Sequence, residues 1–193
     1  MIMRTAVLTI LMLLGAATAA SAWSPTAEAV AALATGKPWV SVTVDPSSEA
    51  AIIHAAIDIP APPQKVWTAM IDCRNAARMV ANVTRCQILS QGPGWDVREH
   101  VTRGGPLIPS IRNVFRSDYE PYRRIRFHRV EGDLRTMEGA WGLIPLNGGR
   151  GTRVTYENRL SVRIFAPPAL IRAGLRKDTP KVLENLRRIV SGD

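Results

Sequence analysis

The stretch IDIPAPPQKVWTAMID at residues 57–72 contains a strand-to-helix transition and is the most informative part of the chain. Its first residues complete an apolar segment, 51–59, that is typical of a buried strand. Three prolines between residues 60 and 63 end this strand, because proline has no N–H group to donate to a sheet. Apolar residues then recur at helical spacing, which predicts a helix from about Pro63 to Asp72.

After this helix the sequence changes to the two-residue period of β-strands. One more short helix is expected over 74–81, followed by six strands. The strands are expected at 84–91, 95–103, 110–119, 123–130, 134–146 and 152–165. Turn sequences such as Gly92-Pro93-Gly94 and Asn147-Gly148-Gly149 separate them. Such short connections join antiparallel strands, so the spacing predicts sequential hairpins rather than a parallel sheet.

Both ends of the chain add further elements. On the amino-terminal side, a short helix is expected over 23–38 and a strand over 39–44. On the carboxyl-terminal side, apolar residues between 170 and 190 form one stripe with arginines and lysines mostly opposite, which predicts an amphipathic helix. Pro180 interrupts this stripe, and we expect either a kink there or a second helix start capped by Thr179.

The composition is that of an ordinary globular protein, with 46% hydrophobic and 21% charged residues among 193. Residues 1–22 resemble a cleavable signal peptide, with Arg4 before an apolar run and Ala20-Ser21-Ala22 at its end. An uncleaved membrane anchor is the alternative. Residues 23–193 suit one domain with a sizeable core, and no later apolar run approaches the roughly 20 residues of a membrane-spanning helix. We therefore expect an exported protein, periplasmic or secreted.

The chain has two cysteines, Cys73 and Cys86, and export would place both in an oxidising compartment. Disulfides persist in oxidising compartments, so a bridge between them is expected. A loop this short stabilises the fold by about 3 kcal/mol in the chain-entropy model. Two unpaired thiols are the alternative.

The formal net charge of +9 makes the chain basic. For a cytoplasmic protein this charge would indicate nucleic acid as the first partner to test, but export argues against that partner. An anionic membrane surface is the more accessible polyanion, and we expect peripheral contact with it as one possibility. A solvated basic surface without a partner is the other.

Further segments carry a resemblance to a known family: WDVREHV at 95–101, MEGAWGLIPL at 137–146 and GTRVTYENRL at 151–160. With the stretch at 57–72, they resemble the START-like (SRPBCC) superfamily, in its polyketide cyclase/dehydrase and coenzyme Q-binding protein branch, over residues 50–191.

The resemblance implies an α+β helix-grip fold. In that fold a curved antiparallel sheet of about seven strands wraps around a long C-terminal helix, with two short helices after the first core strand and an apolar ligand cavity inside. The expected division is a signal peptide at 1–22, an N-terminal extension at 23–50 and a START-like helix-grip domain at 51–193. The superfamily has no universal catalytic residue, so none is assigned.

Side chains alternate between the two faces of a strand, and the apolar face of each strand is expected to point into the cavity. A loop expected at the cavity mouth and the C-terminal helix add four more. The predicted cavity residues are Trp95, Val97, Glu99, Val101, Leu107, Ile108, Ile111, Asn113, Phe115, Phe127, Arg129, Met137, Trp141, Tyr156, Asn158, Leu170 and Leu175. The polar members would pair, as Glu99 with Arg129, or hold the polar end of a ligand. A one-residue bulge that turns them to solvent is the alternative.

The opposite face of the sheet is predicted to be strongly basic. Its members are Arg98, His100, Arg112, Arg116, Arg124, Arg126, His128, Arg153, Arg159 and Arg163.

Three functions remain open on the sequence. The first is an exported binding or carrier protein for a hydrophobic small molecule such as a lipid, an isoprenoid or a polyketide-like compound. The second is a cyclase/dehydrase-type enzyme that uses Glu99 and Tyr156. The third is an envelope protein that acts through its arginine-rich face. We expect no metal, no cofactor and no nucleic acid, since the chain lacks metal-ligand spacing, a nucleophile elbow and a phosphate-binding loop.

Overall fold

The computed structural model describes residues 23–80, 82–104, 110–163 and 168–192. The helices are α1 (Ala27–Leu33), α2 (Pro63–Ile71), the 3-10 turn η1 (Cys73–Asn75), α3 (Ala76–Met79), the 3-10 turn η2 (Asn147–Gly149) and α4 (Pro168–Ser191). The strands are β1 (Trp39–Val44), β2 (Ala51–Ile59), β3 (Val83–Gly92), β4 (Trp95–Thr102), β5 (Ile111–Glu120), β6 (Arg124–Gly132), β7 (Leu134–Leu146) and β8 (Gly151–Val162).

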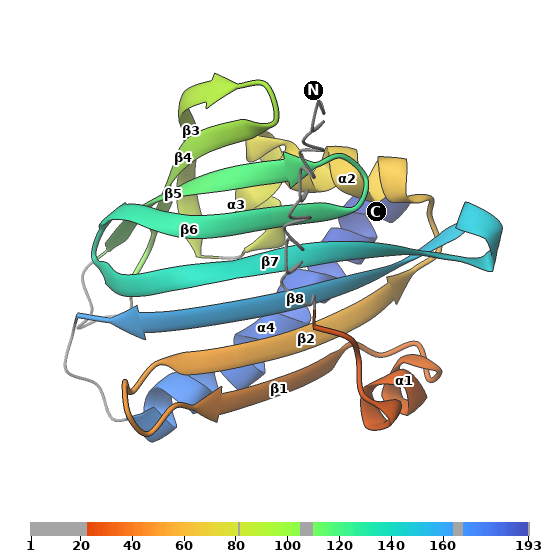
Figure 1. Ribbon diagram of the computed structural model, residues 1–193, viewed down its shortest axis with the longest axis horizontal. Coiled ribbons are helices and arrows are strands. Elements are labelled where there is room, and N and C mark those ends of the chain that lie inside the picture. The colour runs from red at the N-terminus through yellow and green to blue at the C-terminus, as the bar shows by residue number, and fades with distance from the viewer. Residues whose placement is uncertain (1–22, 81, 105–109, 164–167, 193) are drawn as a thin grey trace, which may run out of the picture.

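The described strands form one antiparallel sheet in the order β1-β2-β8-β7-β6-β5-β4-β3. Figure 1 shows α4 crossing behind the curved sheet, with α2 and α3 on the same side as α4. This is the predicted α+β helix-grip arrangement. The sheet has one strand more than expected because β1 continues its edge, pairing Trp39 with Ala56 and Val44 with Ala51.

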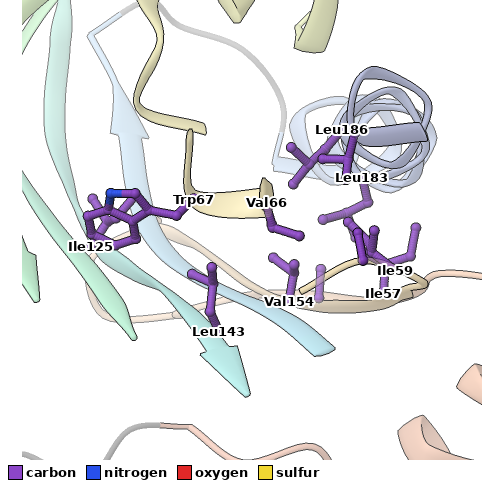
Figure 2. Close-up of a cluster of buried hydrophobic side chains, with 12 residues drawn as sticks. Ile57, Ile59, Val66, Trp67, Ile125, Leu143, Val154, Leu183 and Leu186 are labelled. Carbon is purple, nitrogen blue, oxygen red and sulfur yellow. The ribbon is translucent and has the colours of Figure 1, made fainter. Parts of the chain in front are cut away.

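Helix α2 forms where the sequence predicts it, with proline at its first turn and no side-chain cap. Its buried residue Val66 points towards Leu183 of α4, and Trp67 points towards Ile125 of β6; all belong to one cluster of buried side chains (Figure 2). Full burial of such a side chain stabilises a fold by about 1.5–3 kcal/mol. The packed core therefore joins the sheet, α2 and α4 and holds α4 in place.

Helix α4 continues through Pro180 as one element, so the second helix start at Thr179, one of the two expected alternatives, does not occur. Proline removes one intrahelical hydrogen bond and strains the turn before it. The residues that follow, Leu183, Leu186 and Val190, are at most 2% exposed. Burying them offsets the loss at Pro180 and keeps the helix continuous.

Among the helices of the described residues, none combines the length and the apolar character that a membrane-spanning helix needs.

The N-terminal segment lies against the outer side of the sheet edge. Ala29 and Leu33 of α1 are buried, and α1 contacts β1 and β2. The Trp23 ring stacks on His54, with 5.0 Å between the ring centroids, and on Trp39 at 5.7 Å. These contacts tie the segment before β1 to the first two strands.

Gly139 allows β7 and β8 to approach each other closely. A Cβ atom at this position would lie 2.0 Å from the Glu157 carbonyl oxygen and 2.9 Å from the Asn158 Cα atom. We expect Gly139→Ala to lower the free energy of unfolding by about 1–3 kcal/mol or more, because backbone rather than a flexible side chain must move. Gly174→Ala in α4 is the control: its Cβ would meet nothing within 4 Å, and alanine favours a helix by up to about 1 kcal/mol. Urea unfolding of both variants checks this, and equal effects would contradict it.

Candidate functional site

A cavity of about 420 Å³ lies between the sheet and the helices, beside the packed core. This volume is within the range that holds a drug-sized molecule. Its lining residues come from the helical segment after β2, from β3 to β8 and from α4. They are Met70, Ile71, Met79, Val80, Val83, Arg98, His100, Thr102, Ile111, Asn113, Phe115, Ser117, Tyr119, Ile125, Phe127, Leu134, Met137, Trp141, Tyr156, Leu160 and Leu175. The lining is mostly apolar, with a few polar groups concentrated on β4 and β5.

Aromatic rings form one continuous wall of the cavity. Trp141 and Tyr156 stack with 4.1 Å between ring centroids, Phe127 stacks on Tyr156 at 6.2 Å, and Phe115 meets Phe127 edge-on at 6.5 Å. Burial raises the pKa of Tyr156 to about 12, and its hydroxyl accepts a hydrogen bond from Asn158 Nδ2 at 2.7 Å. The wall is therefore aromatic and uncharged, which suits an apolar ligand.

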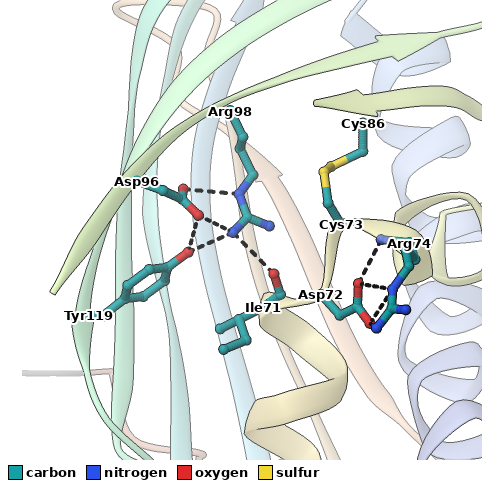
Figure 3. The surroundings of a disulfide bond; sticks show 8 residues. All are labelled: Ile71, Asp72, Cys73, Arg74, Cys86, Asp96, Arg98 and Tyr119. Carbon is teal, nitrogen blue, oxygen red and sulfur yellow. Dashed lines mark hydrogen bonds and ion pairs between the residues drawn. A yellow bond between two sulfur atoms is a disulfide. The ribbon is translucent and has the colours of Figure 1, made fainter. Parts of the chain in front are cut away.

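A buried ion pair on β4, between Asp96 and Arg98, lies at another part of the cavity lining (Figure 3). The Arg98 guanidinium binds both carboxylate oxygens of Asp96 and donates to the Tyr119 hydroxyl at 2.6 Å and to the Ile71 carbonyl at 3.3 Å. The Tyr119 hydroxyl donates in turn to Asp96 at 2.6 Å. Burial is the largest single effect and acts to lower the pKa of Arg98, but the hydrogen bonds and charge interactions with Asp96 and Tyr119 together outweigh it, so this pKa is raised. Because Ile71 is the last residue of α2, this network fastens the end of that helix to the sheet.

The disulfide between Cys73 and Cys86 fastens the same segment at a second point. Cys73 is the first residue of η1 and Cys86 lies in β3, so the bridge ties the chain after α2 to the edge of the sheet (Figure 3). The predicted pairing is thus present in the structure. Together with Arg98, it sets the position of Ile71, Met79 and Val80 in the cavity wall.

Strand β4 presents the opposite face from the one predicted. Arg98, His100 and Thr102 line the cavity. The prediction that Arg98 and His100 lie on the outer face is therefore wrong. The predicted cavity residues that lie on the outer side instead are Trp95, Val97, Glu99 and Val101. The assumption that the apolar face is the inner one is wrong here because Asp96 and Arg98 neutralise each other, which allows a polar face to be buried.

The predicted pair between Glu99 and Arg129 does not form. Glu99 binds Arg112 and Arg85 instead, and these two guanidinium groups hold the pKa of its carboxyl below the ordinary value. Arg129 donates to the Gly132 carbonyl at 2.9 Å. Glu99 and Tyr156 are therefore on opposite sides of the sheet, and the structure does not bring the proposed enzymatic pair together.

The other predicted cavity residues fall into three groups. Eight of them line the cavity: Ile111, Asn113, Phe115, Phe127, Met137, Trp141, Tyr156 and Leu175. Arg129, Asn158 and Leu170 do not, and Leu170 is 67% exposed near the start of α4. Leu107 and Ile108 lie outside the described residues.

The predicted list missed the wall that the helical segment contributes. Met70, Ile71, Met79 and Val80 come from α2, from α3 and from the residue after it. Helical spacing indicated that Met70 and Ile71 face inward. It did not indicate whether they pack against the core or border a cavity, which depends on where α2 crosses the sheet.

The arginines of the outer face are largely neutralised. Their carboxylate partners lie on the same or a neighbouring strand, or at the strand ends. The pairs are Arg112–Glu131, Arg116–Asp118, Arg124–Glu157, Arg126–Glu120, Arg153–Asp58 and Arg159–Asp45. The predicted basic face is thus a lattice of ion pairs over much of its area.

His100 makes the fold sensitive to acid. Burial, reinforced by the nearby positive charge of Arg98, lowers the pKa of His100 from 6.5 to about 4. The folded state therefore binds fewer protons than the unfolded chain as the pH falls from 6.5 towards 4, and stability present above pH 6.5 is lost on acidification. We expect a loss of about 2 kcal/mol between pH 6.5 and 4.5.

Urea unfolding of wild type and His100→Gln across this range measures that loss. The variant keeps His54, His128 and every carboxylate but should lack this part of the pH dependence. The same slope in both proteins would show that another group is responsible.

This fold and cavity define a class of protein, the START-like helix-grip domains. The sequence model of the family described as "Polyketide cyclase / dehydrase and lipid transport" matches residues 59–187. The chain therefore belongs to this family. No curated protein sequence matches it.

Solved structures share the fold at low sequence identity. A STAR-related lipid transfer protein from Xanthomonas axonopodis is 17% identical, with a TM-score of 0.69 over 87% of this chain and 97% of that one. The lipid transfer and protein localization domain of human StarD13 is 14% identical, with a TM-score of 0.67 over 80% and 84%. The Zhui aromatase/cyclase from a Streptomyces species is 17% identical, with a TM-score of 0.62 over 72% and 93%.

Proposed function

We propose that this protein is an exported binding or carrier protein for one hydrophobic small molecule, of lipid, isoprenoid or polyketide-like type. The observation that carries the proposal is the 420 Å³ cavity beside a fully packed core. If α4 served only to complete the core, side chains would be expected to fill the space between Leu175 and the aromatic wall. That this space is open supports a role in holding a ligand. Burying an apolar ligand there would contribute about 25 cal/mol for each Å² of apolar surface removed from water.

The disulfide bond supports export. The Cys73–Cys86 bridge fits an oxidising compartment, periplasmic or extracellular, because the cytosol keeps most thiols reduced. The expected signal peptide, residues 1–22, lies outside the described residues. Mass spectrometry of the protein secreted from its own cells tests this part: a mature chain beginning at Trp23 with the bridge intact is the expected result.

The two other functions receive less support. An enzyme using Glu99 and Tyr156 would need both groups in one cavity, and they lie on opposite sides of the sheet. Membrane attraction through the outer face would need free cations, and six of the arginines assigned to it form ion pairs with carboxylates. The cavity therefore supports the carrier function better than the structure supports either alternative.

A dye-binding experiment tests the carrier proposal. N-phenyl-1-naphthylamine is uncharged and fluoresces in apolar surroundings, so we expect it to bind the wild-type protein with one saturable site. Leu160→Trp places a large ring into the cavity lining and should weaken this binding at least tenfold. Val130→Trp is the matched control, since Val130 is 49% exposed on β6 and outside the lining.

Equal dye binding by the two variants would show that the dye does not enter the cavity. Absence of saturable binding to the wild type would overturn the proposal itself. Native mass spectrometry of the protein purified from its own envelope then identifies the molecule it carries.

A further inference from the structure

Two polar atoms in the cavity wall lack the hydrogen-bond partners that buried groups ordinarily have. His100 Nε2 and Asn113 Oδ1 are buried and have no partner in the described part of the protein. Both residues line the cavity. Buried polar atoms are almost always hydrogen-bonded, so an exception at a cavity wall indicates a group that binds there.

The two side chains belong to one site because their strands are paired. His100 of β4 lies directly opposite Asn113 of β5 in the antiparallel register. The Cβ atoms of residues paired in this way are about 4.5–5.5 Å apart, and their side chains project to the same face. One small polar group of a ligand can therefore reach both.

Neighbouring residues fix the orientation of each group. Asn113 Nδ2 donates to Met137 Sδ at 3.0 Å, which leaves the amide oxygen as the free atom. The His100 ring meets Phe115 edge-on, with 4.9 Å between the ring centroids. The site thus offers one hydrogen-bond acceptor, Asn113 Oδ1, and one nitrogen that can donate a hydrogen bond, His100 Nε2. Contacts with neighbouring residues orient both side chains before a ligand binds.

The charges around His100 and Asn113 indicate that the polar group of the ligand is neutral. Arg98 is the one arginine or lysine among the described lining residues, and Asp96 neutralises it. His100 is uncharged at neutral pH because burial depresses its pKa, and burial keeps Tyr119 and Tyr156 protonated. A carboxylate or phosphate in this wall would lose its hydration without gaining an unpaired cation.

We propose that His100 and Asn113 form a polar subsite that binds the hydroxyl group of an uncharged hydrophobic alcohol or phenol. One hydroxyl satisfies both free atoms, since it donates to Asn113 Oδ1 and accepts from the His100 Nε2–H group. The aromatic wall of Phe127, Trp141 and Tyr156 receives the apolar body. This inference rests on the proposed function and specifies the chemical class of the ligand.

Displacement of N-phenyl-1-naphthylamine from the full-length mature protein by three compounds tests the subsite. Naphthalene, 2-naphthol and 2-naphthoate share one apolar body and differ in carrying no polar group, a neutral hydroxyl or a negative charge. At neutral pH we expect 2-naphthol to bind roughly tenfold more tightly than naphthalene, which corresponds to about 1.4 kcal/mol. We expect 2-naphthoate to bind more weakly than 2-naphthol.

Two variants remove the subsite without removing the cavity. Asn113→Leu and His100→Phe should each reduce the preference for 2-naphthol over naphthalene to about twofold or less, while naphthalene still binds. His128→Phe is the matched control, because His128 is exposed on β6 and lies outside the lining. It should keep the wild-type preference.

The outcomes separate this inference from the proposed function. Binding of naphthalene and 2-naphthol with equal affinity by the wild type, or tightest binding of 2-naphthoate, would overturn the subsite and leave the carrier proposal standing. Absence of any saturable dye binding would overturn the carrier proposal. The comparison among the three compounds needs only wild-type protein, so it remains decisive if a variant fails to fold.

Discussion

Replacing Arg98 with methionine is expected to lower the free energy of unfolding by about 3–5 kcal/mol. Arg98 and Asp96 are 6% and 5% exposed, and the guanidinium also binds Tyr119 and the Ile71 carbonyl at the end of α2. Methionine fills a similar volume but leaves the Asp96 carboxylate buried without a cation. Urea unfolding under oxidising conditions measures the loss.

Arg116→Met is the matched control for this experiment. Arg116 also pairs with an aspartate two positions away, Asp118, but both side chains are about one-third exposed. An exposed pair contributes about 0–1 kcal/mol. The Arg116 guanidinium also lies 4.3 Å from the centre of the Trp95 ring, a contact that contributes about 0.5–1 kcal/mol, so the control should lose at most about 2 kcal/mol. The double variant Asp96→Asn with Arg98→Met should be more stable than Arg98→Met alone, because no buried charge remains. Similar losses for Arg98→Met and Arg116→Met would contradict the buried network.

Removing the disulfide is expected to lower the free energy of unfolding by about 3 kcal/mol. The bridge joins Cys73 and Cys86, 13 positions apart, and restricts the unfolded chain between them. In the folded protein it holds η1 and α3 against β3. The variant Cys73→Ser with Cys86→Ser, unfolded in urea beside the oxidised wild type, measures the effect.

Reductant provides the control and a local readout. Dithiothreitol should lower the stability of the wild type to that of the serine variant and should leave the variant unchanged. Hydrogen exchange should accelerate at the α3 amides, whose segment loses one of its two attachments to the sheet. A wild-type protein that is insensitive to reductant, with its thiols shown to be free, would rule out the bridge.

Most of the fold could be predicted because its signals are local. Turn sequences such as Gly92-Pro93-Gly94 separate strands of period two, and the predicted strands match the observed ones to within a few residues. The prolines before α2 mark the change from strand to helix. The additional strand β1 was recognised as a strand but assigned to an extension, since its pairing with β2 is a contact that periodicity does not reveal.

The cavity could be predicted only in part because it depends on which face of each strand points inward. On β5 to β8 the apolar face is the inner one, and Phe115, Phe127, Trp141 and Tyr156 line the cavity as predicted. On β4 the rule fails, because Asp96 and Arg98 compensate each other's charge and allow a polar face to be buried. The subsite at His100 was consequently assigned to the outer face.

A single bulge explains why the sequence could not correct this error. Counting back from the tight turn, where Gly92 pairs with Trp95, an uninterrupted β3–β4 hairpin would place Cys86 opposite Val101. The disulfide turns Cys86 towards the helices, so that count would put Val101 inside. The register shifts between Ile88 and Ser90, and Cys86 pairs with His100 instead. One extra residue on β3 therefore places Cys86 on the same face as His100 rather than Val101.

By itself, then, the amino-acid sequence determined the order of strands and helices, the pairing of the two cysteines and the existence of an apolar layer beneath α4. The order of the elements and the apolar layer follow from proline, turn residues and hydrophobic period, which act over a few neighbouring positions. The cysteine pairing follows from the presence of two cysteines in a chain expected to be exported. Only the tertiary structure decided that Arg98 and His100 point inward, that Glu99 points outward and that the space under Leu175 stays open. Those outcomes depend on the register between strands and on the compensation of charges that lie on different elements.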